Sequence, residues 1–283
     1  MAEHGAAARR DFHFIFGLKP QAEPFHLVHY LCLESCRRVN APAEIRLHYR
    51  HLPFGPWWDR IAPHLTLCPV TATSTGFDPS RYARTQEGSF IAGAGLSYAH
   101  EADFIRQDVL IEHGGVYADI DTLFVRPYPP SYYVHECLLG EEPPVLASTG
   151  LLRPSLCNAV IFAQPGSRFM RRWRDVSAEV FDGSWSRHSC QAASELGYAG
   201  TDGIHIAPQR SFYCFGRERA SFASLFDEPD ADVRGVYSIH LWAHLWWSET
   251  RTDLSGFHAG RLTEAWVRAS DATYAQFARR FLD

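Results

Sequence analysis

Two aspartates spaced two residues apart, Asp119 and Asp121, are the first candidates for chemistry in this sequence. They interrupt the apolar stretch Val116 to Val125, whose pattern predicts a strand. Side chains two residues apart in a strand point to the same face, so both carboxylates would project together while Ile120 points into the core. Paired carboxylate oxygens suit Mg²⁺ or Mn²⁺, and such an ion can also hold phosphate oxygens. The pair therefore predicts a divalent-cation site, although an Asp-x-Asp taken alone is more often a solvated turn.

A second charged pair lies upstream, in the segment Ser97 to Glu112 that predicts a helix. Asp103 and Arg106 are three residues apart and therefore share one face of that helix. The pair Gly114-Gly115 ends the helix and would fold it back toward the strand that bears the aspartates. An ordinary surface ion pair at this spacing contributes less than about 1 kcal/mol. The nearby aspartates favour a role in a site instead.

These residues stand in a fixed order: Ala102-Asp103-Phe104-Ile105-Arg106, then Gly114-Gly115-Val116-Tyr117, then Asp119-Ile120-Asp121. The order and spacing resemble the DXD-motif glycosyltransferases of GT-A fold, the glycosyltransferase sugar-binding region family. Glu101 stands where a small residue is common. The resemblance implies an α/β fold of GT-A type, a single Rossmann-like α/β/α sandwich with a mixed, mainly parallel central sheet.

The resemblance also implies roles for these residues. Asp119 and Asp121 would engage a divalent cation, Mn²⁺ or Mg²⁺, bound to the diphosphate of a UDP-sugar donor. Asp103 and Arg106 would contact the donor sugar. Tyr117 belongs to the same motif and is assigned to the donor site.

The segment Ser238 to Trp247 resembles the late His-x-Trp segment of the same family. A neutral histidine nitrogen is a tolerable ligand for Mn²⁺, and we favour His240 over His244 as the third metal ligand. Trp246 and Trp247 would close over the pyrophosphate or stack on a sugar, since an indole offers a flat apolar face and one N–H donor. A buried tryptophan-rich strand with satisfied histidines is the alternative.

Three further parts of the site rest on weaker resemblance. The run Phe12 to Gly17 is similar to the opening strand of the family, whose end packs on the nucleotide base, so Phe16 and Gly17 are candidates for uridine contact. Phe16 could equally be part of the core. Asn158 is a candidate near the sugar or the acceptor. Gln191 is a candidate at the reacting centre, with a solvated helix start as the alternative.

The resemblance implies a retaining glycosyltransferase that moves a hexose or an N-acetylhexosamine from a UDP-sugar. The acceptor would be a small molecule, a peptide or a glycan. A metal-dependent hydrolase is a second hypothesis, but it would need further Asp, Asn or His ligands for a two-metal site, and the partners here are Arg106 and tryptophans. A non-catalytic nucleotide-sugar-binding protein is a third, which the intact aspartate pair disfavours.

The elements that must position these residues alternate between strands and helices, which favours a layered α/β sheet with parallel members. Strand patterns occupy residues 12–17, 45–51, 65–70, 116–125, 134–139, 158–163, 203–207 and 236–242. One helix pattern begins after Pro24, and others occupy residues 97–112, 167–181, 189–196 and 262–281. Residues 71–95 predict a long loop that could order over the donor. We expect one catalytic domain over 1–283, with a nucleotide-sugar-binding half at about 10–125 and an acceptor-side half with a C-terminal helix at about 126–283.

Composition excludes several classes of protein. The chain has 283 residues, 46% of them hydrophobic, and a formal charge of −5, which together exclude fibrous, low-complexity and disordered chains. The mild acidity gives no electrostatic footprint for nucleic acid. An apolar run of about twenty residues, the length a membrane span needs, does not occur in the sequence.

Seven scattered cysteines without an apolar leader indicate reduced thiols in a cytoplasmic protein. Cys32 and Cys36 lie near His26 and His29 and raise a zinc hypothesis, which the lack of paired ligands from two segments disfavours. Lys19 is the only lysine among 27 basic residues, which indicates a GC-rich, bacterial genome.

Overall fold

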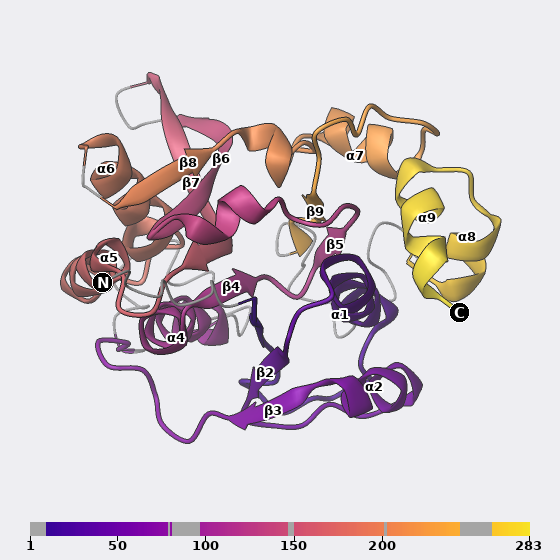
Figure 1. Ribbon diagram of the computed structural model, residues 1–283, viewed down its shortest axis with the longest axis horizontal. Helices are drawn as coiled ribbons and strands as arrows, with labels where there is room; N and C mark the ends of the chain where they lie inside the picture. Colours follow the sequence, from indigo (N-terminus) through magenta and orange to yellow (C-terminus); the bar gives the residue numbers. More distant parts are fainter. Residues whose placement is uncertain (1–9, 79, 81–96, 147–149, 201–202, 244–261) are drawn as a thin grey trace, which may run out of the picture.

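A seven-stranded sheet forms the centre of the computed structural model, which describes residues 10–78, 80, 97–146, 150–200, 203–243 and 262–283 (Figure 1). Its strand order is β3-β2-β1-β4-β7-β6-β8. The bounds are β1 Phe12–Ile15, β2 Ile45–Tyr49, β3 Thr66–Pro69, β4 Gly115–Ala118, β6 Cys137–Leu146, β7 Leu152–Ala163 and β8 Ile204–Ala207. Strand β7 runs against its neighbours β4 and β6, and every other pairing within this sheet is parallel. The prediction of a mixed, mainly parallel sheet is therefore confirmed.

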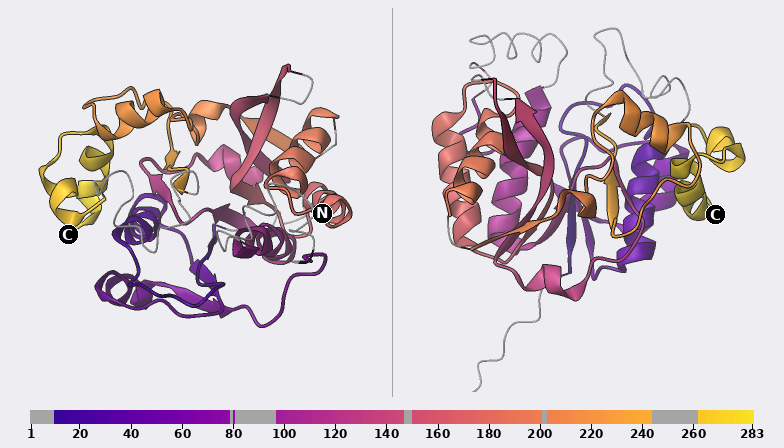
Figure 2. Two further views of the ribbon diagram at one scale, coloured as in Figure 1. Left: turned by 180° about the vertical axis from the view of Figure 1, so that it is seen from behind. Right: turned by 90° about the horizontal axis from the view of Figure 1, so that it is seen from above.

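Helices cover both faces of this sheet (Figure 2). On one face lies α1, Leu27–Asn40, together with α2 (Pro56–Ile61), α7 (Arg219–Phe226), α8 (Glu264–Ala269) and α9 (Thr273–Ala278). The other face carries α4 (Ser97–His113), α5 (Arg168–Val180) and α6 (Ala192–Tyr198). Successive side chains of β4 point to opposite faces of the sheet and so belong to two separate hydrophobic cores. Val116 and Ala118 pack on the α1 side, and Tyr117 packs on the α4 side.

The predicted strand at 116–125 is wrong in one respect, because the chain forms two strands there. β4 ends at Ala118, and β5, Thr122–Phe124, pairs with β9, Ser238–His240, in a separate antiparallel sheet. Between them a tight turn is closed by the Thr122 N–H, which donates to the Asp119 carbonyl at 3.1 Å. The two aspartates therefore lie in a turn and not along one extended strand.

Other element boundaries also differ from the predictions. The helix predicted at 262–281 is broken between α8 and α9, where the Ala272 N–H donates to Ser270 Oγ at 3.1 Å in place of a helical bond. The segment 189–196 is a π-type turn, Arg187–Gln191, followed by α6. The strand predicted at 134–139 begins only at Cys137, because Pro130–Val134 forms a 3-10 turn. The helices α2 and α7 were not predicted.

The Gly114-Gly115 turn joins α4 to β4 as predicted. Both glycines have positive φ, 67° and 96°, which side chains rarely adopt. A Cβ on Gly115 would lie 2.6 Å from the Asp11 carbonyl oxygen, so the helix can return to the sheet here only through glycine. This turn sets α4 beside β4 and brings Asp103 and Arg106 toward the aspartates.

Candidate functional site

A cavity of about 710 Å³ lies where β1 and β4 end. It is within the size range of small-molecule sites. Ten residues proposed from the sequence line it: Phe16, Gly17, Asp103, Arg106, Tyr117, Asp119, Asp121, Asn158, Gln191 and His240. Trp246, Trp247 and the alternative ligand His244 lie outside the described residues, as does most of the predicted loop at 71–95.

The sheet explains why these residues meet. β1 and β4 are parallel neighbours, so the residues after their last positions, Phe16 and Asp119, emerge at the same edge. β7 runs antiparallel beside β4, and its Ala159 carbonyl accepts a hydrogen bond from the Asp119 N–H at 2.8 Å. Asn158, the residue before Ala159, is thereby placed at the same edge.

Asp119, Asp121 and His240 form a cluster with the ligand geometry of a metal site, their ligand atoms all lying within 4.8 Å of one another. His240 Nε2 lies 3.2 Å from Asp121 Oδ1 and 3.6 Å from Asp119 Oδ2. The β5–β9 pairing sets this arrangement, because it places Thr122 opposite His240. The Ala243 N–H then donates to Asp121 Oδ2 at 2.8 Å and fixes that carboxylate.

Burial and neighbouring charges have opposite effects on the pKa values of Asp119 and His240. Burial raises the pKa of Asp119, although Arg106 and His240 act in the opposite direction. Burial alone would lower the pKa of His240, but the carboxylates of Asp121 and Asp119 raise it above its usual value. The Asp119 side chain keeps 26% of its surface exposed, so one carboxylate faces the cavity. Two carboxylates and one imidazole are a donor set that fits Mn²⁺ or Mg²⁺.

Arg106 ties the aspartate turn to α4. Its Nη1 lies 3.2 Å from Asp119 Oδ1 and donates to the Asn158 carbonyl at 2.8 Å, while its Nη2 lies 3.1 Å from Asp103 Oδ1. The guanidinium stacks over the Tyr117 ring at 4.4 Å from the centroid. Burial alone would lower the pKa of Arg106, but the surrounding carboxylates outweigh this effect and raise the pKa above its usual value. The buried guanidinium therefore stays charged.

Tyr117 and Asn158 orient neighbouring side chains of the site. The Tyr117 hydroxyl donates to Asp119 Oδ1 at 2.7 Å, and Asn158 Nδ2 donates to Asp103 Oδ1 at 2.7 Å. Burial would raise the pKa of Asp103, but Arg106 and the imidazoles of His100 and His188 hold it well below its usual range. A charged Asp103–Arg106 pair therefore lines the cavity beside the metal-type cluster.

Phe16 and Gly17 line the cavity directly after the end of β1. Phe16 is half-buried and packs against the rings of Phe25 and His29, at centroid distances of 5.0 and 4.8 Å. Gly17 has a φ of 77°, and a Cβ there would lie 2.1 Å from the His51 carbonyl oxygen. Phe16 therefore has a packing role as well as a surface toward the cavity, and Gly17 is required by the turn.

Sequence reasoning missed one residue that lines the cavity and two that contact Asp103 from behind it. Glu142 on β6 lines the cavity and accepts a hydrogen bond from Ser155 Oγ at 2.5 Å. Burial raises its pKa. His100 and His188 contact Asp103, and only His100 carried a signal, since it precedes Asp103 by three residues on the same helix. Gln191 lines the cavity, and its Nε2 donates to Ser186 Oγ at 2.8 Å.

Within the described part of the chain, Cys32, Cys36, His26 and His29 do not form a cluster that could hold zinc. The groups there with metal-ligand geometry are the Asp119 cluster and a His100–Asp103–His188 group. His29 Nδ1 instead lies 3.0 Å from the Ile120 carbonyl oxygen, and Cys32 Sγ donates to the Asp119 carbonyl at 3.6 Å. These side chains support the backbone of the aspartate turn.

Comparison with known proteins finds a family that resembles the region around this site. Residues 76–139 match the family described as the glycosyltransferase sugar-binding region containing a DXD motif. This region includes both aspartates and the Asp103–Arg106 pair. The match agrees with the resemblance drawn from the sequence.

A particular relative is glucan organizing enzyme 1 of Cryptococcus neoformans var. grubii, which is 29% identical over 281 residues, covering 95% of this chain and 69% of that protein. That relative is fungal, so the comparison gives no support to the predicted bacterial origin. A cytoplasmic location stays a prediction. Among the helices that the structure describes, none is both long and apolar enough to cross a membrane.

Solved glycosyltransferases show distant similarity. PaToxG glycosyltransferase is 15% identical with a TM-score of 0.45, covering 68% of this chain and 69% of that one. The galactosyltransferase LgtC, solved with donor and acceptor sugar analogues, is 15% identical with a TM-score of 0.40, covering 90% of this chain and 98% of that one.

Proposed function

We propose that this protein is a retaining, metal-assisted glycosyltransferase that transfers a hexose or an N-acetylhexosamine from a UDP-sugar to an acceptor hydroxyl. The observation that carries the proposal is the convergence of Asp119, Asp121 and His240 at one cavity, beside the buried cation of Arg106. A nucleoside diphosphate is the ligand class that matches an oxygen-rich cation site next to a fixed arginine. Mn²⁺ is favoured over Mg²⁺ because the cluster includes an imidazole.

The three parts of the donor match three parts of the cavity in this proposal. Asp119, Asp121 and His240 would hold the divalent ion, which would neutralise the charge that develops on the departing diphosphate. The sugar would lie against the Asp103–Arg106 pair. The uridine would lie at the end formed by Phe16 and Gly17.

The residues of the chain orient the reacting groups. Tyr117 and Arg106 fix Asp119, and the Ala243 N–H fixes Asp121, so both carboxylates are set before the donor arrives. The bond between the anomeric carbon and the diphosphate oxygen breaks, the acceptor oxygen bonds to the same face, and the hydroxyl proton passes to the departing diphosphate. Asn158 and Gln191 line the cavity where they would position the sugar and the acceptor.

The acceptor would be bound by the half of the chain from about 126 to 283. Glu142, Trp185 and Arg217 line the cavity and come from that half. Glu142 is buried and carries a carboxylate suited to accept a hydrogen bond from an acceptor hydroxyl. A small molecule, a peptide or a glycan would each present such a hydroxyl.

The test compares D121N with a charge-matched control, D232N. D121N keeps an oxygen that can accept the Ala243 N–H but removes one negative charge from the cluster, whereas Asp232 is ion-paired on the surface with Arg210 and Arg234. We expect D121N to abolish the Mn²⁺-dependent thermal shift with UDP and to lower UDP-sugar hydrolysis at least about a hundredfold. D232N should behave as the wild type.

The donor is found by screening UDP-glucose, UDP-galactose and UDP-N-acetylglucosamine in the same assay. Retention is measured from the anomeric configuration of the product by NMR. Mn²⁺-dependent UDP binding that survives in D121N would remove the metal role, and an inverted product would overturn the retaining mechanism.

A further inference from the structure

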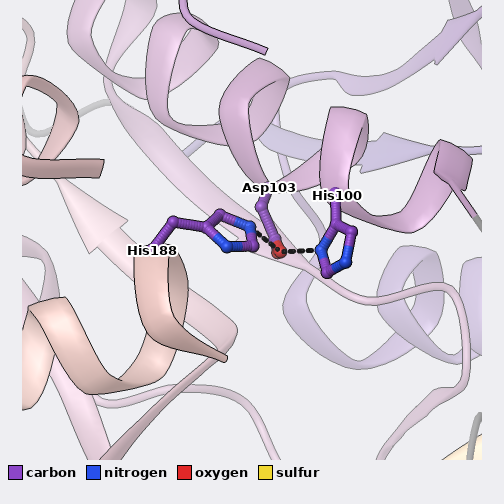
Figure 3. A group of neighbouring side chains, drawn as sticks. All are labelled: His100, Asp103 and His188. Atoms are coloured by element: carbon purple, nitrogen blue, oxygen red, sulfur yellow. Dashed lines mark hydrogen bonds and ion pairs between the residues drawn. The ribbon is translucent and has the colours of Figure 1, made fainter. Parts of the chain in front are cut away.

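A buried cluster of two imidazoles and one carboxylate lies at the wall of the cavity (Figure 3). Asp103 stands between His100, from its own helix α4, and His188, from the π-type turn Arg187–Gln191. His188 is fully buried and does not line the cavity, whereas Asp103 does. The side chain of His188 therefore contacts the lining of the cavity through Asp103.

The two oxygens of Asp103 contact different side chains. Oδ2 lies 2.9 Å from His188 Nε2 and 3.9 Å from His100 Nδ1. Oδ1 accepts from Asn158 Nδ2 at 2.7 Å and lies 3.1 Å from Arg106 Nη2. A rotation of this carboxylate would therefore disturb both Asn158 and Arg106.

The ring of His188 is held rigidly. It stacks on Phe104 at a centroid distance of 5.4 Å with the planes 4° apart, and it meets Phe181 edge-on at 4.9 Å. Its carbonyl accepts a hydrogen bond from Ser177 Oγ at 2.6 Å. π-type turns of this kind occur frequently at functional sites.

The protonation of His188 follows from its partners. Burial lowers its pKa even though Asp103 acts to raise it, so the ring is neutral at neutral pH. A neutral imidazole has one N–H, and a carboxylate only accepts, so the proton is on Nε2 and is donated to Asp103 Oδ2.

We propose that His188 is a positioning residue for the donor sugar: it fixes the carboxylate of Asp103 and, through it, Asn158 and Arg106. This inference rests on the proposed function, since it assumes that the sugar lies against Asp103. The same three side chains could ligate a cation, but Arg106 lies 3.1 Å from the other oxygen of Asp103, and the His188 distance is that of a hydrogen bond. Hydrogen bonding is therefore the role that this geometry favours.

Two amide substitutions that differ mainly in reach provide the test. H188Q places an amide N–H near the position of Nε2 and can still donate to Asp103, whereas H188N places its amide near the position of Nδ1 and cannot reach. We expect H188N to lower kcat for hydrolysis of the UDP-sugar about tenfold to a hundredfold, and H188Q to stay within about threefold of the wild type. The affinity for UDP with Mn²⁺, measured by calorimetry, should be unchanged in both, because the diphosphate site is intact.

Several outcomes would overturn the proposal. These are a wild-type kcat in H188N, an equal loss in both variants, or a parallel loss of UDP affinity in H188N, which would indicate a general structural role. If the wild type binds no UDP with Mn²⁺, the proposed function fails, and crystal structures of the two variants then decide the positioning role. An Asp103 carboxylate that keeps its place against Asn158 and Arg106 in H188N would refute that role. A carboxylate that rotates away from them in H188N and stays in place in H188Q would support it.

Discussion

At the scale of single residues, each carboxylate of the site is held by a neighbouring protein group before any ligand binds. Asp119 has Tyr117 and Arg106, Asp121 has the Ala243 N–H, and Asp103 has His188. Each partner restricts the rotation of a carboxylate that would otherwise be mobile. Substitutions of these partners should therefore alter ligand binding more than they alter the fold.

Y117F tests this at Asp119. The variant removes a buried hydroxyl that donates to Asp119 Oδ1 at 2.7 Å. We expect the Mn²⁺ affinity measured by calorimetry to fall about tenfold, and the free energy of unfolding to fall by about 1 kcal/mol. Y132F is the control, because it loses a hydroxyl bonded to Ser211 outside the cavity and should keep full Mn²⁺ affinity. Equal Mn²⁺ affinity in Y117F and the wild type would contradict the role of Tyr117.

The residues of the motif could be predicted from the sequence, but the partners that come from distant parts of the chain could not. Asp103, Arg106 and the two aspartates form a local pattern that can be recognised in the sequence. His188 and Glu142 carry no such pattern, because they reach the site through tertiary packing alone. Sequence periodicity cannot report contacts of that kind.

At the scale of elements, the connection from α4 to β4 decides whether the motif assembles. Its geometry depends on Gly115, whose φ is 96° and whose missing Cβ leaves room for the Asp11 carbonyl. The helix on one side was predicted from its apolar residues and the glycine pair that ends it, and β4 was predicted from its apolar run. The β4–β5 region was not predicted correctly, because a turn of two aspartates inside an apolar stretch looks like a continuous strand until the partner of β5 is known.

G115A tests the importance of this turn. A methyl group would meet the Asp11 carbonyl oxygen at 2.6 Å and would also strain the backbone. We expect the free energy of unfolding, measured with denaturant, to fall by about 2 kcal/mol or more. At Gly200, φ is also positive, at 78°, but a Cβ would have no neighbour within 4 Å, so G200A should cost only about 1 kcal/mol. Similar losses in both variants would mean that close approach at Gly115 is unimportant.

At the scale of the whole molecule, two buried histidines join the sheet to the end of α4. His13 Nε2 lies 3.0 Å from the Gly114 carbonyl oxygen and must donate to it, so His13 Nδ1 accepts from His48 Nε2–H at 3.1 Å. Burial lowers the pKa of His13 to about 3 and that of His48 to about 4. Both rings are therefore neutral in the folded protein.

The stability of the protein should consequently fall as the pH is lowered. Below the unfolded-state pKa of about 6.5 the unfolded chain binds protons that the folded chain does not, so the free energy of unfolding decreases as pH falls from about 6.5 toward the folded-state values. Each histidine contributes up to about 2 kcal/mol of loss between about pH 7.5 and about pH 5. H48Q can still donate to His13, so its loss over this range, measured by denaturant unfolding, should be smaller by about 2 kcal/mol. An identical pH dependence in H48Q and the wild type would show that His48 does not cause it.

The pairing of β5 with β9 also determines when the site is completed during synthesis. Asp119 and Asp121 belong to the middle of the chain, but His240 joins them only through a strand that is made more than a hundred residues later. At roughly 5–20 residues per second, several seconds separate the emergence of the two aspartates from that of the histidine. A nascent chain therefore carries both carboxylates before their imidazole partner exists, and the cluster that we propose to hold a divalent ion is complete only once β9 has been made and has docked.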